Sequence, residues 1–163
     1  MTTATATPAQ CHKYELEIEI NASREAVWKA IFEETNMWWL PDFHVVGADS
    51  EVTFDPQPGG SGLLERTADG GGLLWYSVQM HLPVDFKIYL AGHVAPDWGG
   101  PCTSMLALSL VETENGCILQ VSDARHGNVD ESSISGNQSG WTTLFTEGLK
   151  AFVEGGGQQT RLN

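Results

Sequence analysis

Apolar and polar side chains alternate strictly along the segment from Tyr14 to Asn21. A period of two places successive side chains on opposite faces of a strand, so that one face is buried and the other is solvated. The buried face would carry Tyr14, Leu16, Ile18 and Ile20. We therefore predict a β-strand whose other face, rich in glutamate, lies in water.

The period changes to that of a helix directly after this strand. Asn21 or Ser23 can accept a hydrogen bond from a free amide of the first turn, where Glu25 suits the positive end of the helix dipole. The run 37–40 adds large apolar side chains before Pro41 stops the helix. The apolar positions of the helix fall on one stripe, which consists of Val27, Trp28, Ile31 and Phe32.

Short alternating segments, separated by glycine and proline, occupy the middle of the chain. Prolines and glycines predict turns at 55–60 and 68–71, and Asn115-Gly116 predicts a hairpin. We expect six or seven antiparallel strands in total. The candidates after the first strand are 45–46, 51–54, 62–67, 74–82, 86–92, 106–110 and a last strand that begins at 119.

A second amphipathic helix is expected near the C-terminal end. The polar segment 126–138 predicts a loop, and Ser139 can cap a helix that ends before Gly155. Glycine costs about 1 kcal/mol relative to alanine in a helix, so Gly148 on the apolar stripe predicts a close backbone approach or open space. Residues 13–154 would form one domain between flexible tails at 1–12 and 155–163. The stripe consists of Trp141, Leu144, Phe145, Gly148, Leu149 and Phe152.

Length and charge narrow the class of protein. The chain has 163 residues, which is the usual size of one domain with a single core. Its 21 acidic and 8 basic side chains give a formal charge of -13, and such a surface repels phosphate backbones and anionic lipid headgroups. Met1 to Gln10 lacks the basic start and apolar stretch of a signal peptide, and no later apolar run approaches the ~20 residues of a membrane span. We expect a soluble, cytoplasmic protein that binds neither nucleic acid nor membrane.

The positions of cysteine and histidine do not indicate a metal site. Cys11, Cys102 and Cys117 are irregularly spaced, which favours free thiols over a disulfide framework. The five histidines lie on separate predicted segments, without the spacing of metal ligands. A nucleophile elbow and a nucleotide-binding glycine loop are also missing from the sequence. We therefore predict no metal and no cofactor.

Four motifs occur in the order that is typical of a known superfamily: the segment 20–30, the pair Trp38-Trp39, the turn Asp55 to Gly60, and Gly140-Trp141 in the last helix. With these motifs the chain from Tyr14 to Glu154 resembles the helix-grip fold of the START/SRPBCC superfamily. Within that superfamily it is most similar to the branch named for the activator of the heat-shock-protein-90 ATPase. The resemblance implies an α+β fold, in which a curved antiparallel sheet wraps around a long C-terminal helix and one or two short helices follow the first strand. It also implies a cavity between sheet and helix for a small hydrophobic or amphipathic, lipid-like ligand.

Asp123 and Arg125 are the most distinctive candidates for ligand binding. They continue the inward parity of Leu119 and Val121, where apolar residues would be expected, and a buried charge needs a partner. Paired with each other, they could orient a carboxylate, carbonyl or hydroxyl group of a ligand. A bulge or strand end that turns both side chains to solvent is the alternative. The family often has a histidine at position 123, so the ligand chemistry of the family does not transfer directly to this chain.

Other candidates lie on the inward faces of strands and of the last helix. Tyr76 and Trp141 each need a partner for a polar tip when they are buried. Trp98 lies in a Pro/Gly loop, where it would either cover the mouth of a cavity or simply anchor the loop. No residue is assigned as catalytic. The predicted ligand-binding residues are Trp39, Tyr76, Met80, Trp98, Asp123, Arg125, Trp141 and Phe145.

Three functions remain open from the sequence. The favoured one is a module that binds a small hydrophobic or amphipathic molecule. The alternative is a cofactor-free cyclase, hydrolase or dehydratase, in which Asp123 acts as acid or base and Arg125 or Tyr76 stabilises negative charge. The third is a chaperone-associated protein of the stress response, as the family name implies, although the residues before Cys11 are not expected to encode the separate chaperone-binding domain. A homodimer is also open as an assembly.

Overall fold

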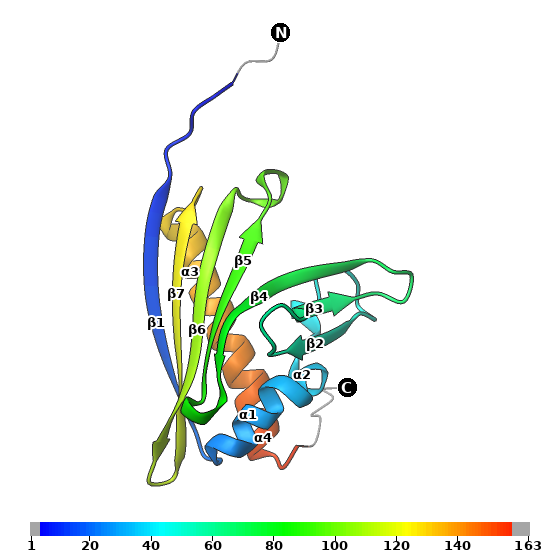
Figure 1. Cartoon of the computed structure of the whole chain (residues 1–163), viewed down its shortest axis with the longest axis vertical. Coiled ribbons are helices and arrows are strands. Elements are labelled where there is room, and N and C mark those ends of the chain that lie inside the picture. The colour runs from blue at the N-terminus through cyan, green and yellow to red at the C-terminus, as the bar shows by residue number, and fades with distance from the viewer. Residues whose placement is uncertain (1–3, 158–163) are drawn as a thin grey trace.

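This computed structural model describes residues 4–157 of the chain. Their central element is a seven-stranded antiparallel sheet (Figure 1). The curved sheet, the long C-terminal helix and the short helices after the first strand confirm the predicted α+β helix-grip fold. Each strand pairs with its neighbours in antiparallel register. The order across the sheet is β1 (Gln10–Ile20), β7 (Gly116–Gly127), β6 (Cys102–Thr113), β5 (Lys87–Val94), β4 (Gly72–Leu82), β3 (Gly62–Arg66) and β2 (Glu51–Asp55).

Two helices connect the first two strands, and a long helix follows the last. They are α1 (Arg24–Glu33) and α2 (Thr35–Trp38), and α1 begins as predicted because the Ser23 hydroxyl accepts a hydrogen bond of 3.2 Å from the Ala26 amide. The C-terminal helix runs without a break through α3 (Glu131–Thr143), the π-helical stretch η4 (Leu144–Lys150) and α4 (Ala151–Glu154). Single 3-10 turns complete the chain: η1 (Pro41–Phe43), η2 (Pro83–Asp85) and η3 (Pro96–Trp98).

The C-terminal helix begins eight residues before the predicted cap at Ser139, so the expected loop over 126–138 is wrong from Glu131 onward. Asp130 caps the helix instead, because its side chain accepts from the Ser133 amide at 2.7 Å while the Ser133 hydroxyl accepts from the Asp130 amide at 3.0 Å. No residue of α3 is fully buried. The apolar periodicity that reveals most helices in a sequence is therefore missing from the first turns of this helix, before Trp141.

A bulge between Val78 and Met80 reverses the faces of β4. An extra residue in one strand shifts every later side chain to the opposite face, and a strict period of two cannot reveal this. Met80 is accordingly 50% exposed, so its predicted inward position is wrong. His81 takes the inward place and stacks on Trp28, with 5.9 Å between the ring centroids.

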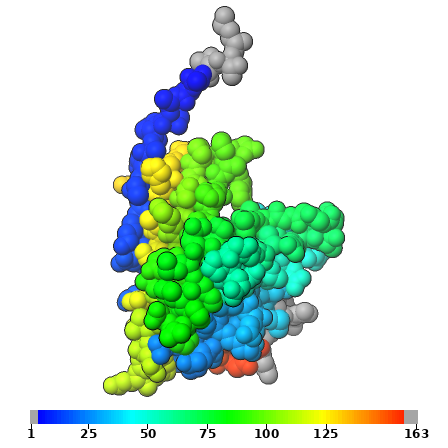
Figure 2. Space-filling view, in the orientation of Figure 1, coloured from blue at the N-terminus to red at the C-terminus, as the bar shows by residue number. Residues whose placement is uncertain are grey.

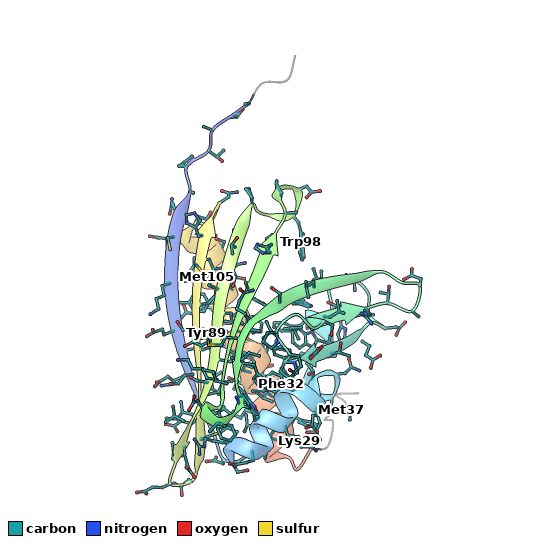
Figure 3. All side chains as sticks on the ribbon, in the orientation of Figure 1. Lys29, Phe32, Met37, Tyr89, Trp98 and Met105 are labelled. Atoms are coloured by element: carbon teal, nitrogen blue, oxygen red, sulfur yellow. The ribbon has the colours of Figure 1, made fainter. Side chains whose placement is uncertain are left out.

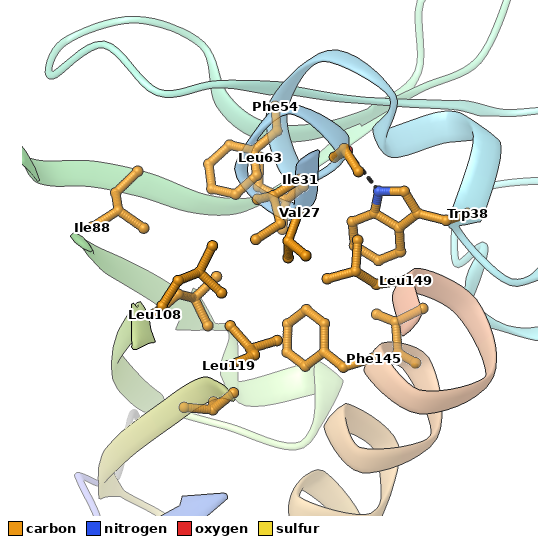
Figure 4. Packing of buried hydrophobic residues seen from close by; sticks show 14 of the residues in the cluster. Val27, Ile31, Trp38, Phe54, Leu63, Ile88, Leu108, Leu119, Phe145 and Leu149 are labelled. Carbon is orange, nitrogen blue, oxygen red and sulfur yellow. Dashed lines mark hydrogen bonds between the residues drawn. The ribbon is translucent and has the colours of Figure 1, made fainter. Parts of the chain in front are cut away.

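The main core lies between the sheet and the helices (Figure 4). The Trp38 indole donates to the Ala30 carbonyl at 2.8 Å and lies beside Phe145. A Cβ at Gly148 would come within 2.5 Å of the Trp38 carbonyl oxygen, which confirms the close backbone approach predicted there. Among the described residues, no helix is both long and apolar enough to cross a membrane.

The predicted tails are only partly described. Residues 10–12 of the N-terminal tail belong to β1 and pair with β7. Residues 1–3 and 158–163 lie outside the described part of the chain.

Candidate functional site

A cavity of about 220 Å³ lies between α3 and the sheet. Its wall is built from β4 to β7, η3, the N-terminal half of the C-terminal helix and the segment after α2. Figure 2 shows the surface hollowed between the turn that joins β5 to β6 and the projecting β3–β4 hairpin. Five of the eight predicted residues line the cavity, and these are Trp39, Tyr76, Trp98, Arg125 and Trp141.

Aromatic rings form most of the apolar wall. Trp39 meets Trp75 edge to face at 5.6 Å, and the rings of Tyr76 and Trp141 lie 6.0 Å apart. Phe145 does not touch this cavity. It is stacked behind Trp141 at 5.2 Å and belongs to the core.

Trp98 stands at the mouth of the cavity. It is 48% exposed and lies in η3, in the connection between β5 and β6, where Figure 3 labels it. Met105 and Tyr89, labelled in the same figure, are exposed residues that do not line the cavity. Of the two roles considered for Trp98, an anchor of the loop and a cover of the cavity mouth, its place in the cavity wall and its exposure favour the second.

Helix α3 turns small residues toward the cavity. Gly136, Asn137 and Gly140 line it, and a Cβ at Gly136 would meet no other atom within 4 Å. Each glycine costs the helix about 1 kcal/mol relative to alanine, and the exposed Gly136 leaves open space on its side of the helix. The sequence analysis named Gly140 only as part of a family motif, and it missed Gly136 and Asn137 because the predicted loop covered them.

Asp123 is buried behind the cavity wall and does not line the cavity. Its two carboxylate oxygens are each taken by a hydroxyl, since Tyr14 donates to Oδ2 at 2.9 Å and Ser104 donates to Oδ1 at 2.6 Å. Ser104 has one hydroxyl proton, which it gives to Asp123, so the contact of 2.9 Å between Tyr76 and Ser104 has Tyr76 as its donor. A directed chain of hydrogen bonds therefore leads from Tyr76 at the wall to the buried carboxylate.

The two tyrosines of this hydrogen-bonded cluster, Tyr14 and Tyr76, stay neutral at physiological pH. Burial, and then the charge of Asp123, raise the pKa of Tyr76 to about 12. The same two causes, in the same order, raise the pKa of Tyr14 well above its ordinary value. Tyr14 and Tyr76 therefore act as hydrogen-bond donors and not as bases.

Arg125 lines the cavity and is 9% exposed. Its Nη2 makes a long contact of 3.8 Å with the Cys102 sulfur, and its Nε is buried without a hydrogen-bond partner among the described residues. The prediction that Asp123 and Arg125 both point inward is confirmed, and the alternative that both face solvent is wrong. The predicted salt bridge between them is not among the ion pairs of residues 4–157.

Glu65 is a second buried carboxylate that the sequence analysis missed. It accepts hydrogen bonds from the Val45 and Val46 amides at 2.9 and 3.1 Å, from the Ser50 hydroxyl at 2.6 Å and from the Trp75 indole at 3.1 Å. Burial alone would raise the pKa of this carboxyl, but these hydrogen bonds outweigh burial and hold the pKa below its usual range. Glu65 thus fixes the loop at 45–46, where a strand was predicted, and also orients Trp75 in the cavity wall.

Metal ligands do not gather in the described part of the chain, where no group of three histidine, cysteine or acidic side chains could hold a metal ion. The site consists mainly of aromatic and aliphatic side chains, and its polar groups are Arg125, the hydroxyls of Tyr76 and Ser104, His93 and Asn137. Such a surface can bind an organic molecule by apolar contact and hydrogen bonds.

Comparison with known proteins bears on the fold. No family model and no curated protein matches the chain. The solved structure of protein MLL2253 from Mesorhizobium loti matches with a TM-score of 0.64 at 18% identity, over 88% of this chain and 97% of that one. Ara h 8.0201 matches with a TM-score of 0.63 at 12% identity, over 90% and 99%. Protein CV1439 from Chromobacterium violaceum matches with a TM-score of 0.62 at 19% identity, over 87% and 96%. At these identities the similarity establishes the helix-grip fold alone, and the branch of the heat-shock-protein-90 ATPase activator is not confirmed.

Proposed function

We propose that the protein binds a small hydrophobic or amphipathic molecule in the cavity between α3 and the sheet. The observation that carries this proposal is a largely apolar wall, rich in aromatic rings, that includes a few polar residues: Tyr76, His93, Ser104, Arg125 and Asn137. Predominantly apolar walls with a few placed polar groups are typical of ligand sites. The cavity, at about 220 Å³, is smaller than the ~300–1,000 Å³ of sites for drug-sized molecules. The ligand is therefore about the size of one ring with a short substituent.

The glycines of α3 favour this proposal over plain packing. Gly136 is an exposed residue that also lines the cavity, and no other atom lies within 4 Å of the position that a Cβ would take. A side chain would fit there and alanine would stabilise the helix, yet the position carries glycine. A ligand that needs access past this position accounts for the glycine.

The enzymatic alternative loses its geometric basis. A direct acid or base must reach the substrate by a hydrogen bond or through one water. Asp123 is separated from the cavity by Ser104, and both of its oxygens already accept hydrogen bonds. The chaperone-associated function stays a prediction that the cavity neither requires nor supports.

The replacement Gly136→Leu is expected to fill the cavity and to weaken ligand binding at least tenfold without loss of stability. Leucine finds open space at this position and is a much better helix former than glycine. Binding of phenylacetate, phenylacetamide and 2-phenylethanol should be measured by isothermal titration calorimetry, and thermal unfolding followed in parallel.

Ser139→Leu is the matched control, because it adds the same side chain to an exposed position of the same helix that does not line the cavity. We expect this variant to bind the probes like the original protein. Equal affinity in both leucine variants, or no saturable binding of any probe to the original protein, would argue against the cavity as a ligand site.

A further inference from the structure

We propose that the ligand is a small aromatic acid whose carboxylate is bound by Arg125 at the buried end of the cavity. This inference rests on the proposed function and specifies the chemical class of the ligand. It depends on three independent observations: the charge of the cavity wall, the free donors of Arg125 and the direction of the hydrogen bonds around it.

The charge of the cavity wall is opposite to that of the whole protein. The chain has 21 acidic and 8 basic side chains. Among the described residues, the wall contains one arginine and neither aspartate nor glutamate. A cavity that took its composition from the rest of the chain would be acidic. The distribution instead favours an anionic ligand inside a protein whose outer surface repels anions.

Arg125 keeps donors that no described residue uses. A guanidinium has five N–H donors, and the described residues accept only one hydrogen bond from this one, the weak donation from Nη2 to the Cys102 sulfur at 3.8 Å. Its Nε is buried and has no partner among the described residues. Of the three such buried nitrogens in the described part of the chain, this is the one that belongs to a cavity-lining residue. Buried donors are nearly always paired in folded proteins, so this one is available to an acceptor that is supplied from outside.

Asp123 is not that acceptor in this structure. It lies two residues from Arg125 on the same face of β7, but its oxygens accept from Tyr14 and Ser104, and it forms no ion pair with Arg125 among the described residues. In this arrangement Asp123 offsets the positive charge of Arg125 without forming a hydrogen bond to its guanidinium group. Arg125 thus remains available to a ligand, and Asp123 acts as a positioning residue and not as a ligand contact.

The hydroxyl protons of Tyr76 and Ser104 are used within the hydrogen-bonded chain and are not available to a ligand. Ser104 lies directly opposite Arg125 in the β6–β7 register and gives its proton to Asp123, and Tyr76 gives its proton to Ser104. Among the polar residues of the wall, Arg125 has both the permanent charge and the unpaired donor, so the matching group is an acceptor. A planar carboxylate fits a guanidinium better than any other common acceptor, because two parallel N–H···O bonds can form.

The rest of the wall accounts for the aromatic part of the ligand. Trp141, Tyr76 and Trp75 line the same cavity as Arg125, and aromatic pairs gain from offset or edge-to-face contact beyond simple burial. One ring with a short acidic arm satisfies both the volume and the polarity of the cavity.

Phenylacetate and phenylacetamide test the inference, because they have the same shape and differ in charge. By isothermal titration calorimetry at pH 7, we expect the original protein to bind the acid at least tenfold more tightly than the amide. Arg125→Met should bring the ratio of the two dissociation constants to within threefold of one. Arg125→Lys, which keeps the charge and loses the planar fork, should give an intermediate ratio. Arg66→Met removes an exposed guanidinium outside the cavity and should leave the ratio unchanged.

The outcomes separate this inference from the proposed function. If the original protein binds acid and amide equally, or prefers the amide, the carboxylate assignment is wrong while the binding function stands. If neither compound binds and 2-phenylethanol also fails, the proposed function falls as well. Circular dichroism checks the fold of each variant. Should Arg125→Met fail to fold, Arg125→Lys decides alone, since a ratio equal to that of the original protein would overturn the role of the guanidinium fork.

Discussion

Replacement of Phe145 by alanine is expected to lower the free energy of unfolding by about 3 to 5 kcal/mol. Phe145 is 2% exposed and lies in η4, where it packs between Trp141 and Trp38 at 5.2 and 6.1 Å. Alanine would leave a hole between helix and sheet, because rigid indoles on both sides cannot collapse into the space. Urea unfolding followed by circular dichroism measures the change.

Met105→Ala provides the control for this prediction, since Met105 lies on the solvated face of β6 and is 54% exposed. We expect that change to stay within about 0.5 kcal/mol, as for most surface positions. A cost below about 1 kcal/mol for Phe145→Ala would mean that the C-terminal helix does not pack on the sheet as described.

Asp123→Ala should cost about 3 to 5 kcal/mol of unfolding free energy, because it leaves two buried hydroxyls without an acceptor and Arg125 without a counter-charge. Arg125→Met should cost less than half as much, since the guanidinium makes only one weak contact within the described residues. The same urea experiment compares the two variants. An equal or larger cost for Arg125→Met would show that Arg125 serves the fold, and would remove the argument that its donors are kept for a ligand.

Alternation in the sequence predicted the inward faces of the strands where pairing is regular. Residues of β7 keep one parity from Leu119 to Arg125, so the burial of Asp123 and Arg125 could be predicted from the sequence. The parity failed at Met80, because the bulge in β4 inserts one residue that leaves no mark in the pattern of side chains.

The partners of the buried charges could not be predicted in the same way. Tyr14 reaches Asp123 because β1 and β7 are in a register that sets the two residues opposite each other, although they are far apart in the chain. Strand register over such a separation depends on the whole sheet. Sequence proximity suggested Arg125 as the partner instead, and that pairing does not form.

The start of α3 was missed for a related reason. Helices are recognised by an apolar stripe, and the first half of the C-terminal helix has none because it faces a cavity and solvent. The part of the helix that has no apolar stripe is also the part that lines the candidate site. Gly136 and Asn137 border the cavity and do not pack in the core.

The indole signals in a ¹H–¹⁵N NMR titration with phenylacetate test most directly whether the cavity is the ligand site. Of the 6 tryptophans in the chain, Trp28 packs against His81 outside the cavity and serves as an internal control. The account predicts that the Trp28 signal stays in place while the indoles of the cavity wall shift together with a single dissociation constant. Shifts at Trp28 alone, or none at the wall at saturating phenylacetate, would contradict it. The indoles of the wall are those of Trp39, Trp75, Trp98 and Trp141.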